Sequence, residues 1–200
     1  MLTADNSHLI KYHSLIQAGD VIVGQELRTE LDRLIEDIKT ERYIYDTKRS
    51  DLRIKFMEGC IRLTKSPFYG KPMVLMDWQK AFIEAVYSFQ MPTDKTDRFR
   101  RVLLLMGRKN SKSETCSALG LTELILGNDG SDIVCSSNDD NQANILYEAT
   151  NVMRKMIDPK QKDTWKNQQH ISCNFNGSKI FKLSDRTRNK EGRVLRPLKG

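Results

Sequence analysis

A run of five apolar residues, followed at once by a polar loop and a helical pattern, constrains the fold of this chain more than any other feature. Residues 102–106 read Val-Leu-Leu-Leu-Met. A continuous apolar run of this length is typical of a strand buried on both faces of a parallel sheet. The loop after it contains Gly107, and residues 114–126 have a helical pattern that ends before Gly127. A strand, a glycine-containing loop and a helix in this order predict an α/β fold.

The same alternation continues after this helix. Residues 133–135 are a second strand candidate, and the next helix is predicted to bury one apolar face, made of Ala143, Leu146, Ala149, Val152, Met153 and Met156. Residues 171–173 and 179–183 are short strands on either side of an Asn-Gly pair, which is a hairpin signal. We therefore predict a parallel sheet flanked by helices, with right-handed crossovers.

The first ninety residues are predicted to be mainly helical. One apolar stripe of 3.6-residue period lies within residues 27–38. A second stripe contains Phe82, Ala85, Val86 and Phe89 and follows Asp77, which is a candidate helix cap. Residues 66–72 hold two prolines and a glycine and are predicted to be a connector.

The loop between the first strand and its helix has the chemistry of a phosphate-binding loop. Residues 106–113 read Met-Gly-Arg-Lys-Asn-Ser-Lys-Ser. Exposed main-chain N–H groups and the positive end of the helix would hold phosphate oxygens. Lys112 would then pair with the β and γ phosphates, and the Ser113 hydroxyl would be a ligand of Mg²⁺. The pattern departs from G-x-x-x-x-G-K-[ST], because Met106 and Ser111 stand at the two glycine positions. A chance Lys-Ser pair in a basic loop is the alternative.

At this loop the chain resembles the large terminase subunits of tailed bacteriophages, which are ATPases that drive double-stranded DNA into a procapsid. Loops of that family run from a small residue through Arg and two variable residues to Gly-Lys-Ser or Gly-Lys-Thr. Residues 107–113 are similar at every place except Ser111. Residues 75–79, which end in Trp78-Gln79, look like the family's adenine-reading element. With residues 136–143 and 190–192, the resemblance spans most of residues 40–192.

The resemblance implies an ATP and Mg²⁺ site. Nucleotide contacts are expected from Trp78, Gln79, Gly107, Arg108, Lys109, Asn110, Ser111, Lys112 and Ser113, with Ser113 on the metal. Arg108 and Lys112 would be the catalytic residues, since a loop arginine near the γ-phosphate stabilises the transition state. The alternatives are a solvated basic loop for Arg108 and Lys109, a core aromatic for Trp78, and a solvent-facing helix residue for Gln79.

The residues needed for rapid hydrolysis are missing from the sequence. No apolar run after residue 113 ends in the Asp-Glu pair of a Walker B strand, and no nuclease domain with clustered aspartates follows. We therefore expect a truncated terminase whose own ATPase activity is uncertain. Its predicted organisation is a helical N-terminal appendage over residues 1–65 and a partial P-loop ATPase domain, with an incomplete sheet, over residues 66–200.

The charge of the chain favours anionic partners. The formal net charge is +7, and residues 186–199 are rich in Arg and Lys; that stretch could contact DNA phosphates or be a solvated end. By the resemblance, the partners are double-stranded DNA, a small terminase subunit, a portal protein and further copies in a homo-oligomeric ring. Two alternatives are a helicase-like P-loop DNA ATPase and a non-catalytic basic fragment that binds DNA or capsid.

Other features of the sequence exclude several classes of protein. The four cysteines form no C-x-x-C pair, and we expect reduced thiols in the cytoplasm of an infected or lysogenic bacterial host. No apolar run reaches the roughly 20 residues of a membrane helix. His8, His13 and His170 lack the spacing of zinc ligands.

Overall fold

The computed structural model describes residues 6–107, 109–137 and 140–184, and within these residues the fold is mixed α/β. Its contacts divide the chain into two compact units. We name Met1–Lys55 with Val74–Leu104 the helical unit, and Phe56–Met73 with Leu105–Gly200 the sheet unit. The predicted domain boundary after residue 65 stays a prediction. No helix in the described ranges has both the length and the hydropathy needed to cross a bilayer.

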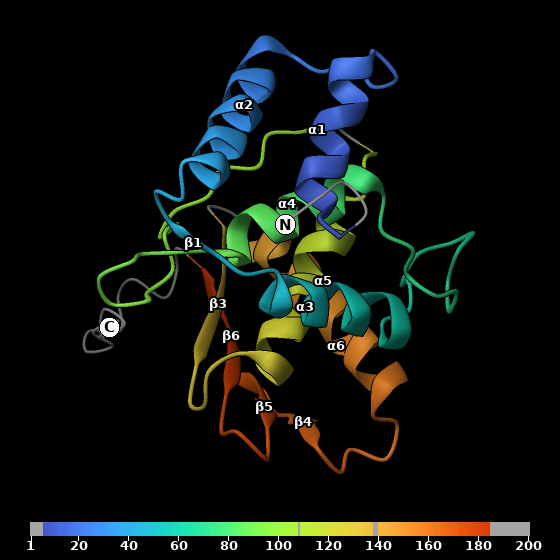
Figure 1. The fold of residues 1–200 in the computed structure, drawn as a ribbon. Helices are drawn as coiled ribbons and strands as arrows, with labels where there is room; N and C mark the ends of the chain where they lie inside the picture. Colours follow the sequence, from blue (N-terminus) through green and yellow to red (C-terminus); the bar gives the residue numbers. More distant parts are fainter. Residues whose placement is uncertain (1–5, 108, 138–139, 185–200) are drawn as a thin grey trace. The chain divides into compact units, whose positions relative to one another are not determined.

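The helical unit contains α1 (His8–Ala18), α2 (Gln25–Lys39), α4 (Asp77–Tyr87) and the two-stranded ladder of β1 (Ile44–Tyr45) and β2 (Phe89–Gln90), together with the first part of α3 (Lys48–Cys60). Helix α1 packs against α4 and, less extensively, against α2 (Figure 1). One core cluster of this unit consists of the buried residues Leu9, Tyr12, Ile16, Leu31, Leu34, Ile35, Ala81 and Phe89. The helix predicted from residues 27–38 is therefore confirmed, although its first apolar residue, Leu27, is exposed.

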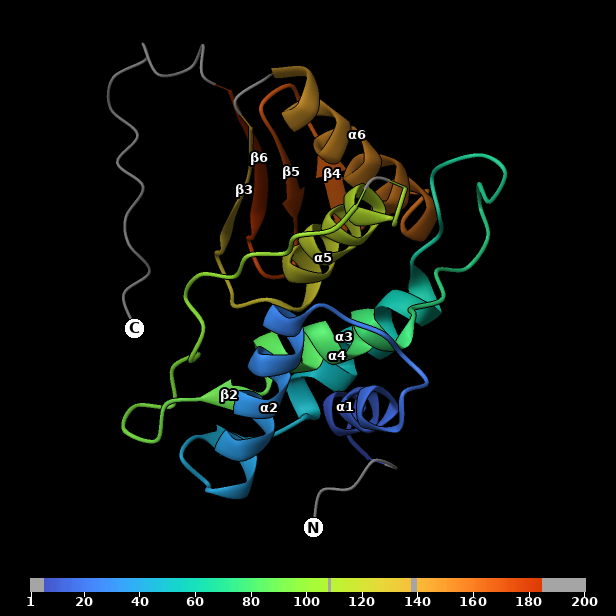
Figure 2. The same ribbon diagram turned by 90° about the horizontal axis from the view of Figure 1, so that it is seen from above.

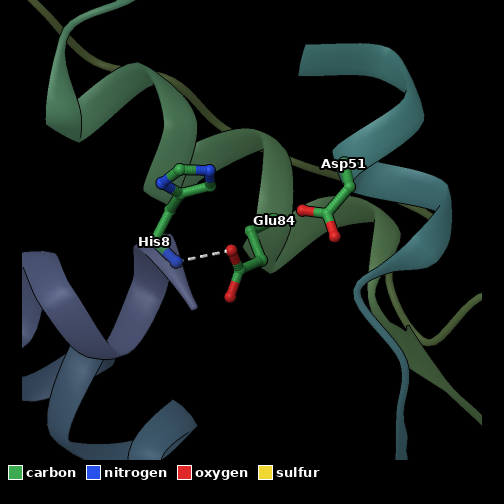
Figure 3. Close-up of side chains that lie close together, drawn as sticks. All are labelled: His8, Asp51 and Glu84. Carbon is green, nitrogen blue, oxygen red and sulfur yellow. Dashed lines mark hydrogen bonds between the residues drawn. The ribbon is translucent and has the colours of Figure 1, made fainter. Parts of the chain in front are cut away.

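A buried carboxylate holds the start of α1 against α4. Glu84 is fully buried and accepts hydrogen bonds from the main-chain N of His8 at 2.7 Å and from Ser7 Oγ at 2.5 Å. Tyr45 donates its hydroxyl to the same carboxylate, and burial beside Glu84 raises the pKa of Tyr45. Figure 3 shows the bond from the main chain of His8 to Glu84. The first N–H groups of a helix lack acceptors within the helix, and Glu84 accepts from one of them. Its negative charge also interacts favourably with the positive end of the helix dipole.

A second buried charge joins the loop after β2 to α2. Arg98 donates to Asp37 at 2.6 Å, and both side chains are less than one-tenth exposed. The Arg98 guanidinium also lies over the ring of Tyr43, 3.8 Å from its centroid. A buried guanidinium needs such partners because the cost of removing it from water is otherwise large.

The sheet unit is built on one mixed sheet with the strand order β3-β6-β5-β4. Its strands are β3 (Asp132–Ser137), β4 (Thr164–Lys166), β5 (His170–Cys173) and β6 (Lys179–Ser184). Strands β3 and β6 are parallel, from Asp132 opposite Lys179 to Ser137 opposite Ser184, while β6, β5 and β4 are antiparallel. Figure 2 shows α5 (Lys112–Leu126) and α6 (Asp140–Ile157) on one side of this sheet, where they contact each other and its strands.

Several predicted elements of the sheet unit are confirmed. The helices predicted after the phosphate loop and after the second strand are α5 and α6, and the predicted hairpin is the β5–β6 pair, with Gly177 in the left-handed region at φ +70°. The predicted parallel sheet is corrected to a small mixed sheet, because the Asn-Gly turn makes β5 and β6 antiparallel.

The predicted strand at residues 102–106 is wrong for the described structure. These residues are in neither a helix nor a strand, and Leu103 and Leu105 are 80% and 82% exposed. A strand exists only through its hydrogen bonds to a neighbouring strand. No strand among the described residues pairs with this run, so an apolar composition alone does not make it one.

We predict that Glu84→Ala destabilises the chain, with a loss of about 3 kcal/mol in the free energy of unfolding, because one buried and two partly buried donors lose a charged acceptor. Chemical denaturation followed by circular dichroism measures the change. Glu36→Ala is the matched control, since Glu36 is exposed on α2. Equal midpoints for the two variants would contradict a structural role for Glu84.

Candidate nucleotide-binding site

The loop before α5 curls through two residues with left-handed backbone. Lys109 has φ +69° and Ser111 has φ +58°, while Asn110 between them is not among the positive-φ residues. Left-handed residues in a turn can direct successive main-chain N–H groups towards one side, which makes a concavity for anions. The loop therefore has a backbone suited to phosphate oxygens.

Helix α5 begins at Lys112, which places Lys112 and Ser113 in its first turn. The Ser111 carbonyl accepts from the Thr115 main-chain N at 2.9 Å and from Thr115 Oγ1 at 3.0 Å. The Ser111 side chain makes no capping bond, so it does not occupy the first N–H groups of the helix. Those groups have no acceptor within a helix and favour an anion at this end.

A carboxylate in the first turn of α5 binds a distant segment. Glu114 is 7% exposed, and its Oε2 accepts from the main-chain N of Thr64 at 3.1 Å. Its other oxygen, Oε1, accepts from Thr64 Oγ1. Both oxygens of Glu114 are thus engaged by a single residue fifty positions earlier in the chain.

Thr64 belongs to a short hairpin over residues 61–73, which we name the 61–73 hairpin. Its main-chain bonds run from Leu63 N to the Lys71 carbonyl at 2.9 Å, from Gly70 N to the Leu63 carbonyl at 2.8 Å, and from Met73 N to the Ile61 carbonyl at 3.0 Å. Gly70 turns the chain with φ +77°, a conformation that other residues rarely adopt. The connector predicted over residues 66–72 is therefore an ordered turn.

A cavity of about 540 Å³ lies where the 61–73 hairpin faces the phosphate loop. The cavity is lined by Leu63, Lys65, Ser66, Phe68, Met106, Gly107, Lys109, Ser111, Lys112, Ser113 and Glu114. Three lysines from two segments contribute positive charge, and Glu114 is the acidic residue of this lining. The cavity is therefore suited to an anion that has several charges and an apolar part.

The structure brings together most of the predicted phosphate contacts. Gly107, Lys109, Ser111, Lys112 and Ser113 line the cavity, whereas Asn110 is not among its lining residues. Arg108 lies outside the described residues, as do the basic residues 186–199 and the region 190–192. The half-buried Ser113 hydroxyl is the predicted metal ligand in this lining, and each Glu114 oxygen already accepts one hydrogen bond from Thr64.

The predicted adenine contacts lie in the helical unit, on α4. Gln79 is 2% exposed, and its Oε1 accepts from the main-chain N of Met76 at 2.8 Å. This bond closes the start of the helix, whose N-cap is Met76 and not the predicted Asp77. Trp78 is partly buried against the core of the unit. Contact of either residue with a base stays a prediction.

Another group of possible metal ligands lies away from the cavity. Ligand atoms of His8, Asp51 and Glu84, all in the helical unit, lie within 4.8 Å of one another (Figure 3). The Glu84 oxygens already accept from Ser7, His8 and Tyr45. These donors satisfy the buried carboxylate without an ion, so we assign the cluster a structural role.

Sequence reasoning missed five residues of the cavity wall, which are Leu63, Lys65, Ser66, Phe68 and Glu114. The first four lie between forty and fifty residues before α5, in a segment that carries only turn signals. Glu114 directly follows Ser113, but its pairing with Thr64 has no local signature. The bonds from Thr64 to Glu114 and the cavity lining identify these residues.

Comparison with known proteins supports the resemblance. The chain is similar to the crystal structure of the HK97 bacteriophage large terminase, with a TM-score of 0.56 and 23% identity over 75% of this chain. The match covers 29% of that terminase, so this chain spans less than a third of its length. No curated protein matches. The sequence profile of the family described as terminase large subunit, ATPase domain, matches residues 77–194, which is more than half of the chain. The chain belongs to the terminase large subunit ATPase domain family.

Proposed function

We propose that this chain binds ATP with its phosphates at the start of α5 and forms the nucleotide-binding part of a viral DNA-packaging motor. The observation that carries the proposal is the cavity of about 540 Å³ lined by Lys65, Lys109 and Lys112 beside the first turn of α5. In it, Lys112 would pair with the β and γ phosphates, and main-chain N–H groups of residues 107–113 would bind their oxygens. Because the chain belongs to an ATPase domain family, we infer that the bound nucleotide is ATP.

The proposed metal contact is the Ser113 hydroxyl. Mg²⁺, when bound with ATP, would neutralise charge on the β and γ phosphates. Arg108 is proposed to stabilise charge on the γ-phosphate, and Trp78 and Gln79 to contact the adenine. Because the sequence has no Asp-Glu pair at the end of an apolar strand after residue 113, we expect this 200-residue chain by itself to bind ATP but to turn it over slowly.

In the complete motor, nucleotide binding would be coupled to translocation of double-stranded DNA into a procapsid. The proposed partners are DNA, a small terminase subunit, a portal protein and other copies of the motor subunit in a ring, in the cytoplasm of the infected or lysogenic host. The net charge of +7 supports an anionic partner.

One observation favours a second candidate function. The positive charge of the chain, without a Walker B pair in its sequence, also suits a non-catalytic fragment that binds DNA or capsid. Such a fragment would bind DNA with strong salt dependence, because phosphate contacts release counterions. Loss of Lys112 alone would change such binding little, because the chain has 33 lysine and arginine residues.

Ser111 stands where the family's loop pattern has glycine, and its backbone is in a conformation that favours glycine. Its φ of +58° and ψ of +20° lie in the left-handed region, which costs an L-residue roughly 1–2 kcal/mol and glycine much less. Its side chain makes no capping bond that would offset this cost. We therefore attribute a strained loop to the serine at this position.

We predict that Lys112→Ala weakens Mg²⁺-dependent ATP binding by roughly 10- to 100-fold, the range expected when one charged hydrogen-bonding partner is lost. Titration calorimetry with ATP and Mg²⁺ measures the dissociation constant. Lys160→Ala is the control, because Lys160 is exposed in the sheet unit and does not line the cavity. Absence of ATP binding in the unmodified chain, with salt-sensitive DNA binding retained, would support the second candidate instead.

We also predict that Ser111→Gly raises the free energy of unfolding by about 1 kcal/mol and tightens ATP binding, because glycine adopts the left-handed conformation without the steric cost. Denaturation midpoints and ATP titration measure the two effects. Ser111→Ala removes the same hydroxyl but keeps a Cβ, so it is the matched variant. Indistinguishable results for the two variants would show that backbone strain at this position is not the cause.

A further inference from the structure

We infer that the 61–73 hairpin is a second wall of the nucleotide site, in which Lys65 is a phosphate-binding residue and Glu114 is a positioning residue that acts through Thr64. The inference rests on the proposed ATP binding at the start of α5. It assigns phosphate contact to a segment that lies before the family match at residues 77–194 and has no place in the phosphate-loop pattern.

The pairing of Glu114 with Thr64 brings the neighbours of both residues together. Lys65 follows Thr64, and Lys112 and Ser113 precede Glu114. Consecutive Cα atoms are about 3.8 Å apart, so a link between residues 64 and 114 leaves the Lys65 backbone close to the first turn of α5. The cavity lining agrees with this geometry, since it includes Lys65 together with Lys112 and Ser113.

The hairpin gives Lys65 a defined backbone position. The main-chain N of Phe68 donates to the Lys65 carbonyl at 2.9 Å, and Gly70 N and Leu63 N close the hairpin on either side. Thr64 is held twice, by its main-chain N and by its hydroxyl. Preorganisation of this kind lowers the entropic cost of binding a ligand.

The charges around the cavity explain what Lys65 would bind. Among the described residues, Lys65, Lys109 and Lys112 form no ion pair, and Glu114 has both oxygens directed to Thr64. Like charges around one cavity repel, and a polyphosphate between them replaces this repulsion with attraction. The contribution of Lys65 should therefore increase with the number of phosphates on the ligand.

The first test compares Lys65→Ala with Lys160→Ala, both of which remove one exposed lysine of the sheet unit. We expect Lys65→Ala to weaken ATP binding about tenfold, the effect of losing one charged hydrogen bond, and to change AMP binding much less. Lys160→Ala should leave both dissociation constants unchanged. Titration calorimetry of the full chain with ATP, ADP and AMP, each with Mg²⁺, provides the values.

The second test addresses the positioning role. Thr64→Val keeps the shape of the side chain but removes the hydroxyl that donates a hydrogen bond to Glu114, whereas Thr64→Ser keeps this hydroxyl. We expect Thr64→Val to weaken ATP binding several-fold. Thr64→Ser should bind ATP as tightly as the unmodified chain. Because Thr64 acts through Lys65, Thr64→Val should add little further loss in a chain that already carries Lys65→Ala. Additive losses in this double-mutant cycle would indicate independent effects and overturn the positioning role.

The outcomes separate this inference from the proposed function. If ATP binds and Lys112→Ala weakens binding as predicted while Lys65→Ala behaves like Lys160→Ala, the hairpin has no phosphate contact and only this inference fails. If Lys65→Ala weakens ATP and AMP equally, Lys65 does not bind the additional phosphates, and the inference also fails. If the unmodified chain binds no ATP, the proposed function fails, and this inference with it.

Discussion

The packing of α5 against α6 is the interaction on which the candidate site depends, because Lys112 and Ser113 are the first two residues of α5. Ala118, Leu121 and Leu124 are fully buried along the helix. Ser117 Oγ donates to the Leu146 carbonyl of α6 at 3.1 Å, and Thr150 of α6 returns a bond to the Ser117 carbonyl at 3.3 Å. Apolar burial holds the two helices together, and these directional bonds define their register. The start of α5 is thereby held in a defined place.

Buried carboxylates that accept from distant segments recur in both units. Glu84 joins the start of α1 to α4 in the helical unit, and Glu114 joins the start of α5 to the 61–73 hairpin in the sheet unit. In each case a main-chain N–H and a hydroxyl donate to one carboxylate. Such a group is costly to bury unless its partners are complete, so the pairing selects one arrangement of the two segments. In the sheet unit, that arrangement forms the cavity.

Local patterns predicted the helices and the β5–β6 hairpin well, because helical periodicity and an Asn-Gly turn are properties of neighbouring residues. They failed at residues 102–106, where strand formation requires a partner strand. They also left the Gln79 side chain open to several roles. In the structure it caps the start of α4 through Met76, a use that depends on local geometry and not on residue type.

The sequence by itself determined the positive charge, the placement of Lys112 and Ser113 at a helix start and the family. The helix start and the candidate phosphate loop could be predicted because their patterns lie in residues close together along the chain. Only the tertiary structure decided that the 61–73 hairpin faces that loop and that Lys65 lines the same cavity. The physical reason is that the Glu114–Thr64 pairing closes a loop of about fifty residues. No local propensity encodes such a contact, since it becomes favourable only when both segments are already folded and shielded from water.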